Sequence, residues 1–421
     1  MAQHTEPRAA RTPLDASPGL LAALGEISQN DIIRERLALF GKERKWIDER
    51  HLEVCRVPAP TFREQERAEF LAELFRGAGH AAHLDDAGNV VVPIELDPAL
   101  PFVAVTAHMD TVLAPRRPSE ISLLPDGTFT GPGVTDNGSG LAALLALARV
   151  FGGDSLLTGL NHNILLVANV AEEGEGNLHG MKYLCRHSPY ASRVAAYLVL
   201  DGASTGHITA AGLGSRRFEI VIESRGGHSW NDFGRANPVH ALGRTVALLA
   251  DTPLPASPRA TLTVSVVEGG AGVNSIAPIA RAKVDIRSRN SAVMQQVVEL
   301  MEEAVRCGVE LENRRATERL SGFRIREIGH RPAAPSQREN PLVECLQTVD
   351  SYLGISSRLD CASTDANVPL AMGLPAAAIG AGGRGGDAHA PSEWFHPEGR
   401  ELGLQRILLT LLFLPPLSSP A

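Results

Sequence analysis

Four short apolar runs constrain what this chain can fold into more than any other feature. Each is continuous, without the alternation of a strand that has one wet face, and they occupy residues 102–107, 164–171, 196–200 and 376–379. Continuous runs of this length are typical of strands buried on both faces, as in a parallel sheet. Because helical patterns lie between them, we predict an α/β fold with a mostly parallel sheet flanked by helices.

The stretch 213–331 has a different pattern. Its four candidate strands alternate apolar and polar residues, as in RRFEIVIE, which indicates one buried and one exposed face. Helical patterns at 238–250 and 292–307 separate them in the order β-α-β-β-α-β, the split motif of ferredoxin-like α+β domains. We predict one domain made of 1–212 and 332–421, with 213–331 inserted into it.

The composition excludes several classes of protein. The chain has 40 Lys and Arg against 48 Asp and Glu, a net charge of −8, so we expect no nucleic-acid partner. Its five cysteines are scattered, which argues against a disulfide framework or a zinc finger. The apolar runs are too short to span a membrane, and the first twenty residues lack the apolar core of a signal peptide. We expect a cytoplasmic protein without a membrane partner.

Potential metal ligands follow each of the four apolar runs, and a further carboxylate lies in the glycine-rich loop GPGVTDNGSG. In an open α/β sheet, ligands bind outside the carboxyl ends of the strands, so side chains placed there converge. The sequence therefore predicts one shared site. Its members are His108, Asp110, Asp136, Glu172, Glu173, Asp201 and His389.

This mixture of imidazole and carboxylate groups suits Zn, Mn or Co better than Mg, which prefers all-oxygen shells. Without Asp110 and one of the two adjacent glutamates, the set still contains five ligands. Five ligands are too many for one catalytic zinc, but they fit two ions that share a carboxylate. The carboxylate of Asp110 could then accept the second ring N–H of His108. Only one of Glu172 and Glu173 need be a ligand, which leaves the other free as general base on a bridging water. We predict two divalent metal ions, Zn first, with Mn or Co as alternatives.

Each residue alone has a less specific interpretation. A lone histidine after a strand is more often a surface residue, and a Glu-Glu pair is more often solvated. Asp201 alone could cap a turn, and Asp136 alone could belong to the turn of Asp-Asn-Gly. The glycines between 131 and 140 do not match G-x-G-x-x-G, so a phosphate-binding loop is disfavoured. The metal centre is favoured because the candidates recur at equivalent positions.

Six motifs resemble those of the co-catalytic di-zinc peptidases and amidohydrolases, a family that includes peptidase T, glutamate carboxypeptidase, aminoacylase and succinyl-diaminopimelate desuccinylase. The resemblance extends from about residue 40 to the C-terminus. The motifs are AHMDTV (107–112), GPGVTDNGSGLAALL (131–145), AEEGEG (171–176), Asp201, GGHSW (226–230) and DAHAPSEW (387–394).

This resemblance implies a role for each site residue. Asp136 would bridge two metals, with Glu172 as the general base and Asp110 as the residue that orients His108. The implied ligand triads are His108, Asp136 and Asp201 for one metal, and Asp136, Glu173 and His389 for the other.

The same resemblance implies that the inserted domain is a lid and the dimerisation surface of a homodimer. His228 would reach the site of the partner subunit and stabilise the developing oxyanion. Asn274 and Arg287 match positions that bind substrate, and the arginine would pair with a carboxylate.

The implied activity is hydrolysis of a C–N bond, in a peptide or an N-acyl amide, of a small substrate that carries a carboxylate. An alternative is removal of an amino group from an aromatic compound, as by 5-nitroanthranilate aminohydrolase, and a less favoured one is a catalytically silent binding protein. Asn137 follows Asp136 where many relatives carry a second Asp, which affects the expected substrate preference rather than metal binding.

Overall fold

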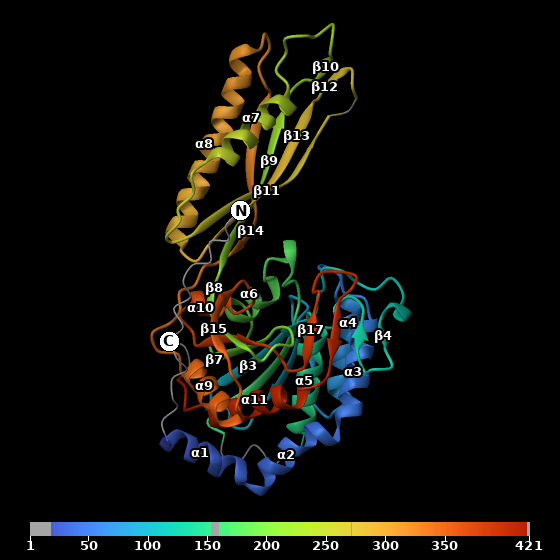
Figure 1. Cartoon of the computed structure of the whole chain (residues 1–421), viewed down its shortest axis with the longest axis vertical. Helices are drawn as coiled ribbons and strands as arrows, with labels where there is room; N and C mark the ends of the chain where they lie inside the picture. Colours follow the sequence, from blue (N-terminus) through green and yellow to red (C-terminus); the bar gives the residue numbers. More distant parts are fainter. Residues whose placement is uncertain (1–17, 153–159, 271, 419–421) are drawn as a thin grey trace. The chain divides into compact units, whose positions relative to one another are not determined.

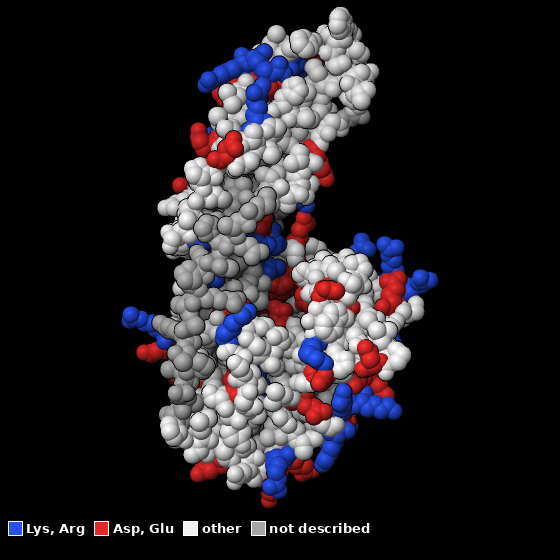
Figure 2. Space-filling view, in the orientation of Figure 1, with Lys and Arg blue, Asp and Glu red and all other residues white. Residues whose placement is uncertain are grey.

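Two compact units make up the chain, and the computed structural model describes its residues 18–152, 160–270 and 272–418. One unit comprises Met1–Ala210 and Gln337–Ala421, and the other comprises Ala211–Ser336 (Figure 1). No described helix has the length and apolar character needed to cross a lipid bilayer. On the face drawn in Figure 2, basic and acidic side chains are interspersed.

An eight-stranded sheet forms the centre of the first unit. Its four central strands are parallel neighbours, in the order β6 (Asn163–Asn169), β3 (Phe102–His108), β7 (Val194–Leu200) and β16 (Ala376–Ile379). They coincide with the four apolar runs, and all their residues are buried, which confirms the predicted mostly parallel sheet. The outer strands are β1 (His83–Leu84), β2 (Val90–Ile94), β8 (His207–Gly212) and β15 (Arg358–Ala362).

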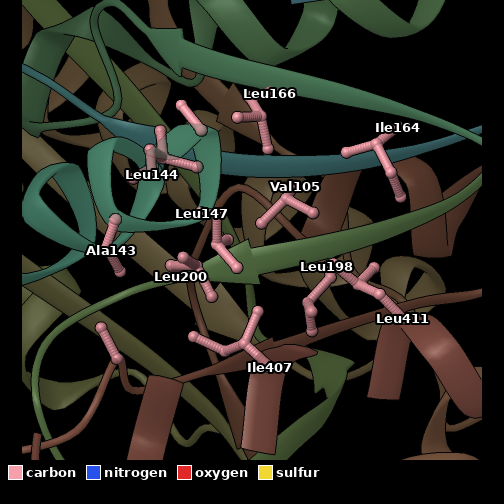
Figure 3. Close-up of a cluster of buried hydrophobic side chains, with 14 of the residues drawn as sticks. Val105, Ala143, Leu144, Leu147, Ile164, Leu166, Leu198, Leu200, Ile407 and Leu411 are labelled. Carbon is pink, nitrogen blue, oxygen red and sulfur yellow. The ribbon is translucent and has the colours of Figure 1, made fainter. Parts of the chain in front are cut away.

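Both faces of the central strands are packed. On one face, Val105 and Leu198 lie in a core with Leu144 of α5 (Gly138–Val150) and Ile407 of α11 (Arg400–Phe413) (Figure 3). On the other face, Tyr197 contacts Cys185 of α6 (His179–Arg186). Each fully buried Leu, Ile or Val contributes roughly 1.5–3 kcal/mol to stability. The other helices of this unit are α1 (Pro18–Gln29), α2 (Asp31–Lys42), α3 (Arg44–Arg56), α4 (Gln65–Gly77), α9 (Pro341–Leu353), α10 (Asn367–Ala371) and the short η1 (Pro118–Glu120) and η2 (Gly174–Gly176).

A small second sheet in the first unit brings two distant loops together. Its order is β17 (Arg384–Gly386), β18 (Trp394–His396), β5 (Phe129–Thr130) and β4 (Ser122–Leu123). Trp394 of β18 pairs with Thr130 of β5. The loop before α5 therefore lies beside the loop that carries His389.

The second unit is a four-stranded antiparallel sheet in the order β11, β13, β9 and β14. Along the chain its elements follow the predicted order β-α-β-β-α-β. Helices α7 and α8 pack their apolar side chains against Phe218 and Ile220, and the opposite face carries ion pairs such as Arg217–Asp285. The bounds are β9 (Gly214–Glu223), α7 (Pro238–Asp251), β11 (Ala260–Gly269), β13 (Ile279–Ser288), α8 (Ser291–Arg315) and β14 (Gly322–Arg331), with a short pair β10 (Gly227–His228) and β12 (Ser275–Ile276).

Candidate metal centre

The carboxyl edge of the parallel sheet gathers the predicted ligands. His108 is the last residue of β3 and Asp201 is the residue after β7, while Glu172 and Glu173 follow the end of β6. Asp136 comes from the loop before α5, and His389 from the loop between β17 and β18. Potential ligand atoms lie within 4.8 Å of one another in three groups: His108, Asp136 and Asp201; Asp136, Glu173 and His389; and His108, Glu172 and Glu173.

Asp136 lies between two imidazole rings. Its Oδ1 is 3.0 Å from Nε2 of His108, and its Oδ2 is 3.1 Å from Nε2 of His389. The same Nε2 of His389 lies 2.8 Å from Oε1 of Glu173. Because each oxygen of Asp136 belongs to a different triad, the carboxylate has the placement of a bridge between two ions.

The buried carboxylates in the site repel one another. Burial raises the pKa of Asp201 to about 7, and the negative charge of Asp136 is the next largest cause of this increase. Hydrogen bonds with Asp136 and Glu173 raise the pKa of His389 to about 10. Acidic groups at this spacing are unfavourable unless a cation neutralises them. The donor set fits divalent metal ions, because imidazole nitrogens and carboxylate oxygens are the ligands of such catalytic sites.

Asp110 is fully buried, and its carboxylate accepts hydrogen bonds from the segment after β6. Its Oδ1 accepts the backbone N–H of Glu172, and its Oδ2 accepts the N–H of Glu173, both at 2.9 Å. Thr61 donates its hydroxyl to the same Oδ2, also at 2.9 Å. Nδ1 of His108 lies 3.0 Å from the backbone oxygen of Asp110 but 3.5 Å from Oδ1. The backbone carbonyl is thus the nearer partner of the ring.

Asn137 has a structural role that sequence reasoning did not identify. Its Oδ1 accepts the N–H of Gly140 at 3.2 Å, and so caps α5. Its Nδ2 donates to the carbonyl of Leu200 at 2.8 Å, next to Asp201. A carboxylate at position 137 could not donate that bond, so the amide joins the Asp136 loop to the end of β7. The Asn-Gly pair before a helical pattern is a capping signal that could have indicated it.

Glu393 is a second residue that sequence reasoning missed, although it lies inside the motif DAHAPSEW. It is 3% exposed, and its carboxylate accepts N–H groups from the Asp136 loop. The only signal in the sequence is an acidic residue four positions after His389, which is too common a pattern to be distinctive.

The remaining three predicted residues belong to the second unit. His228 and Asn274 are neighbours there, since the N–H of Ser229 donates to the carbonyl of Asn274 at 2.9 Å. Nδ1 of His228 accepts the backbone N–H of Trp230 at 3.2 Å, which assigns the ring proton to Nε2 as a donor.

Arg287 lies apart from that pair, near the far end of β13. Within this strand, Ile279 pairs with Glu223 and Arg287 pairs with Ser215. Eight positions of extended chain separate Arg287 from Ile279, roughly 26 Å at the usual rise of a strand. The Nε of Arg287 donates to Asp285 at 2.6 Å.

Comparisons with known proteins identify the family of this chain. A model of Peptidase family M20/M25/M40 matches residues 104–412. The putative LysW-lysine/LysW-ornithine hydrolase of Pyrobaculum aerophilum is 28% identical over 177 residues, 42% of this chain and 47% of the relative. The chain therefore aligns with about half the length of this curated relative.

Solved structures share the fold. Aminopeptidase PepT of Bacillus cereus is 19% identical with a TM-score of 0.65, covering 87% of this chain and 98% of its own. Dipeptidase Dug1p of Saccharomyces cerevisiae is 15% identical with a TM-score of 0.69, covering 90% and 98%. The YXEP protein of Bacillus subtilis, described as a dinuclear metal-binding peptidase of the M20 family, is 16% identical with a TM-score of 0.60, covering 87% and 97%.

The family match includes every one of the predicted metal ligands and all of the second unit. It confirms the resemblance seen in the sequence motifs. The chain therefore belongs to Peptidase family M20/M25/M40.

Proposed function

We propose that this protein cleaves the C–N bond of a peptide or N-acyl amide in a small substrate that carries a carboxylate. The observation that carries the proposal is the placement of Asp136, whose two oxygens face His108 and His389 at 3.0 and 3.1 Å. The names of the relatives, an aminopeptidase, a dipeptidase and a LysW-lysine/LysW-ornithine hydrolase, support the same type of bond.

Two divalent ions, Zn or else Mn or Co, would be held by His108, Asp136 and Asp201 and by Asp136, Glu173 and His389. When bound, they supply Lewis acidity and an activated water for attack on the amide carbon.

Glu172 is the general base in this proposal. Its side chain is 4% exposed and lies in one group with His108 and Glu173. Its carboxylate takes a proton from the attacking water and returns it to the leaving nitrogen. Asp110 holds Glu172 in place through the backbone N–H.

The second unit supplies substrate contacts as the lid of a homodimer. Nε2–H of His228 donates to the oxyanion that forms at the attacked carbonyl, an effect typically worth about 3 kcal/mol for one donor. His228 and Asn274 lie near the start of β13, whereas Arg287 lies near its far end. This pair and Arg287 therefore contact different parts of a substrate or different subunits' sites. Arg287 pairs with the substrate carboxylate through its guanidinium N–H groups.

The test is Glu172→Gln in protein reconstituted with Zn, Mn or Co and assayed on di- and tripeptides, N-acyl amino acids and aminoaromatic acids. Bound metal should stay near two ions per chain while turnover falls roughly 10²- to 10⁴-fold. Glu175→Gln, at an exposed residue nearby, is the matched control. Undiminished turnover in the Glu172 variant refutes the role of Glu172. Ammonia release from aminoaromatic acids without amide cleavage favours the aminohydrolase alternative.

A further inference from the structure

Glu393 joins the loop of the bridging carboxylate to the loop of His389. Its Oε1 accepts the N–H groups of Thr135 at 2.7 Å and Asp136 at 2.9 Å, and its Oε2 accepts the N–H of Gly133 at 2.8 Å. The side chain is 3% exposed. No lysine or arginine pairs with it among the described residues, so backbone dipoles stabilise this buried charge.

Backbone and hydroxyl contacts reinforce the same link. The carbonyl of Glu393 accepts the N–H of Gly131 at 2.9 Å, and the carbonyl of Trp394 accepts the hydroxyl of Thr135 at 2.6 Å. Five hydrogen bonds therefore connect 131–136 with the pair Glu393 and Trp394.

The opposite side of the Asp136 loop is also held. Arg400 can only donate, so its 2.7 Å contact with Nδ1 of His51 leaves the ring proton on Nε2. That Nε2 donates to the carbonyl of Val134 at 2.7 Å. Gly133 has φ +78°, and a Cβ there would lie 2.5 Å from Thr111. The loop thus has little freedom to move, and its position is determined by these partners.

Because His389 comes four residues before Glu393, one short segment supplies both a ligand of the second triad and the anchor of the bridging residue. We propose that Glu393 is a positioning residue that sets the spacing between Asp136 and His389, and so the affinity of the triad Asp136, Glu173 and His389 for its ion. This inference rests on the proposed function, because it assumes that this triad binds a metal.

The experiment is Glu393→Gln, studied in the full-length protein by calorimetric titration with Zn and by the visible absorption of bound Co. An amide has one acceptor oxygen, so its NH₂ must face at least one backbone N–H of the loop. We expect one ion to bind as in the wild type and the other roughly 10- to 100-fold more weakly. His389→Ala provides the reference for selective loss at that triad. The matched control is Glu344→Gln, at an exposed position of α9, which should leave both ions unchanged.

A second variant covers the case in which Glu393→Gln does not fold. Thr135→Val removes only the hydroxyl bond to Trp394, and it should weaken the same ion by a smaller factor, with kcat reduced more than KM changes. The inference is overturned if a folded Glu393→Gln protein binds both ions with wild-type affinity. Where only Thr135→Val folds, wild-type affinity for both ions in that variant has the same consequence. Equal weakening of both ions also overturns the inference. If the wild-type protein itself does not bind two ions, the proposed function fails instead.

Discussion

The carboxylate of Asp110 accepts the backbone N–H of Glu172 at 2.9 Å, so the residue two positions after the proposed metal ligand His108 holds the proposed general base in place. Asp110 is fully buried, and its pKa is lowered because its contacts with His108 and the amides outweigh the effect of burial. It therefore stays ionised as an acceptor. Nδ1 of His108 lies 3.0 Å from the backbone carbonyl of Asp110 and 3.5 Å from its Oδ1, so both groups face the ring.

We predict that Asp110→Asn lowers kcat roughly 10- to 100-fold and also weakens metal binding. The amide can accept at one atom only, so its NH₂ faces the N–H of Glu172 or Glu173 and displaces that segment. Thr61→Val, which removes one donor to Oδ2, should have a smaller effect in the same direction. Steady-state kinetics with measurement of bound metal check this. A kcat for Asp110→Asn equal to that of the wild type would show that the contact is dispensable.

The number of metal ions that a variant retains should depend on how many of the two triads the substitution changes. Asp201→Ala and His389→Ala each remove a ligand from one triad, so each protein is expected to retain one tightly bound ion. Asp136→Ala removes a ligand from both triads and should retain neither. Elemental analysis after dialysis against a weak chelator measures the counts. Two tight ions in the Asp136 variant would contradict the bridging role.

The parts of this protein that sequence could predict depend on local patterns. The apolar runs identify β3 and β7 because burial on both faces leaves no alternation, and parallel strands bring His108 and Asp201 to one edge. Contacts between distant segments leave no such pattern. Glu393 meets Asp136 across 257 positions.

Sequence also does not predict whether the backbone carbonyl or the side chain of a residue lies nearer to a given partner. The proximity of Asp110 to His108 in the chain indicates contact, but not that the carbonyl is the nearer group to the ring. The resemblance implied substrate contacts for Asn274 and Arg287 and an oxyanion contact in the partner subunit's site for His228, without placing the three relative to one another. Only the register of β13 with β9 reveals that Arg287 lies far from the other two.

His162 should make the protein less stable in acid. Its ring is fully buried, neither nitrogen has a partner among the described residues, and burial lowers its pKa from 6.5 to about 4. Above pH 6.5 the ring is neutral whether the chain is folded or unfolded. Between pH 6.5 and 4 the unfolded chain takes up a proton that the folded chain does not, so stability falls by at most about 1.4 kcal/mol per pH unit.

His162→Leu should therefore reduce the loss of stability over this pH range while changing stability little at pH 7.5. The measurement is the free energy of unfolding in urea at pH 7.5, 6, 5 and 4.5, in the presence of chelator so that loss of metal does not contribute. Parallel pH dependences for the two proteins would mean that another group is responsible.

A buried ion pair between α9 and α11 provides a stability prediction away from the metal centre. Nε and Nη2 of Arg406 donate to the two oxygens of Asp350, both at 2.6 Å, with the side chains 0% and 4% exposed. Arg406→Met leaves the carboxylate of Asp350 buried without its cation, which should cost about 3–5 kcal/mol. Asp350→Leu combined with Arg406→Met removes both charges and should cost less than Arg406→Met alone, because apolar groups of similar volume can replace such a pair. Urea unfolding of the two single variants and the double variant forms the cycle. Additive losses in the double variant would show that the two charges contribute independently, contrary to the bidentate contact.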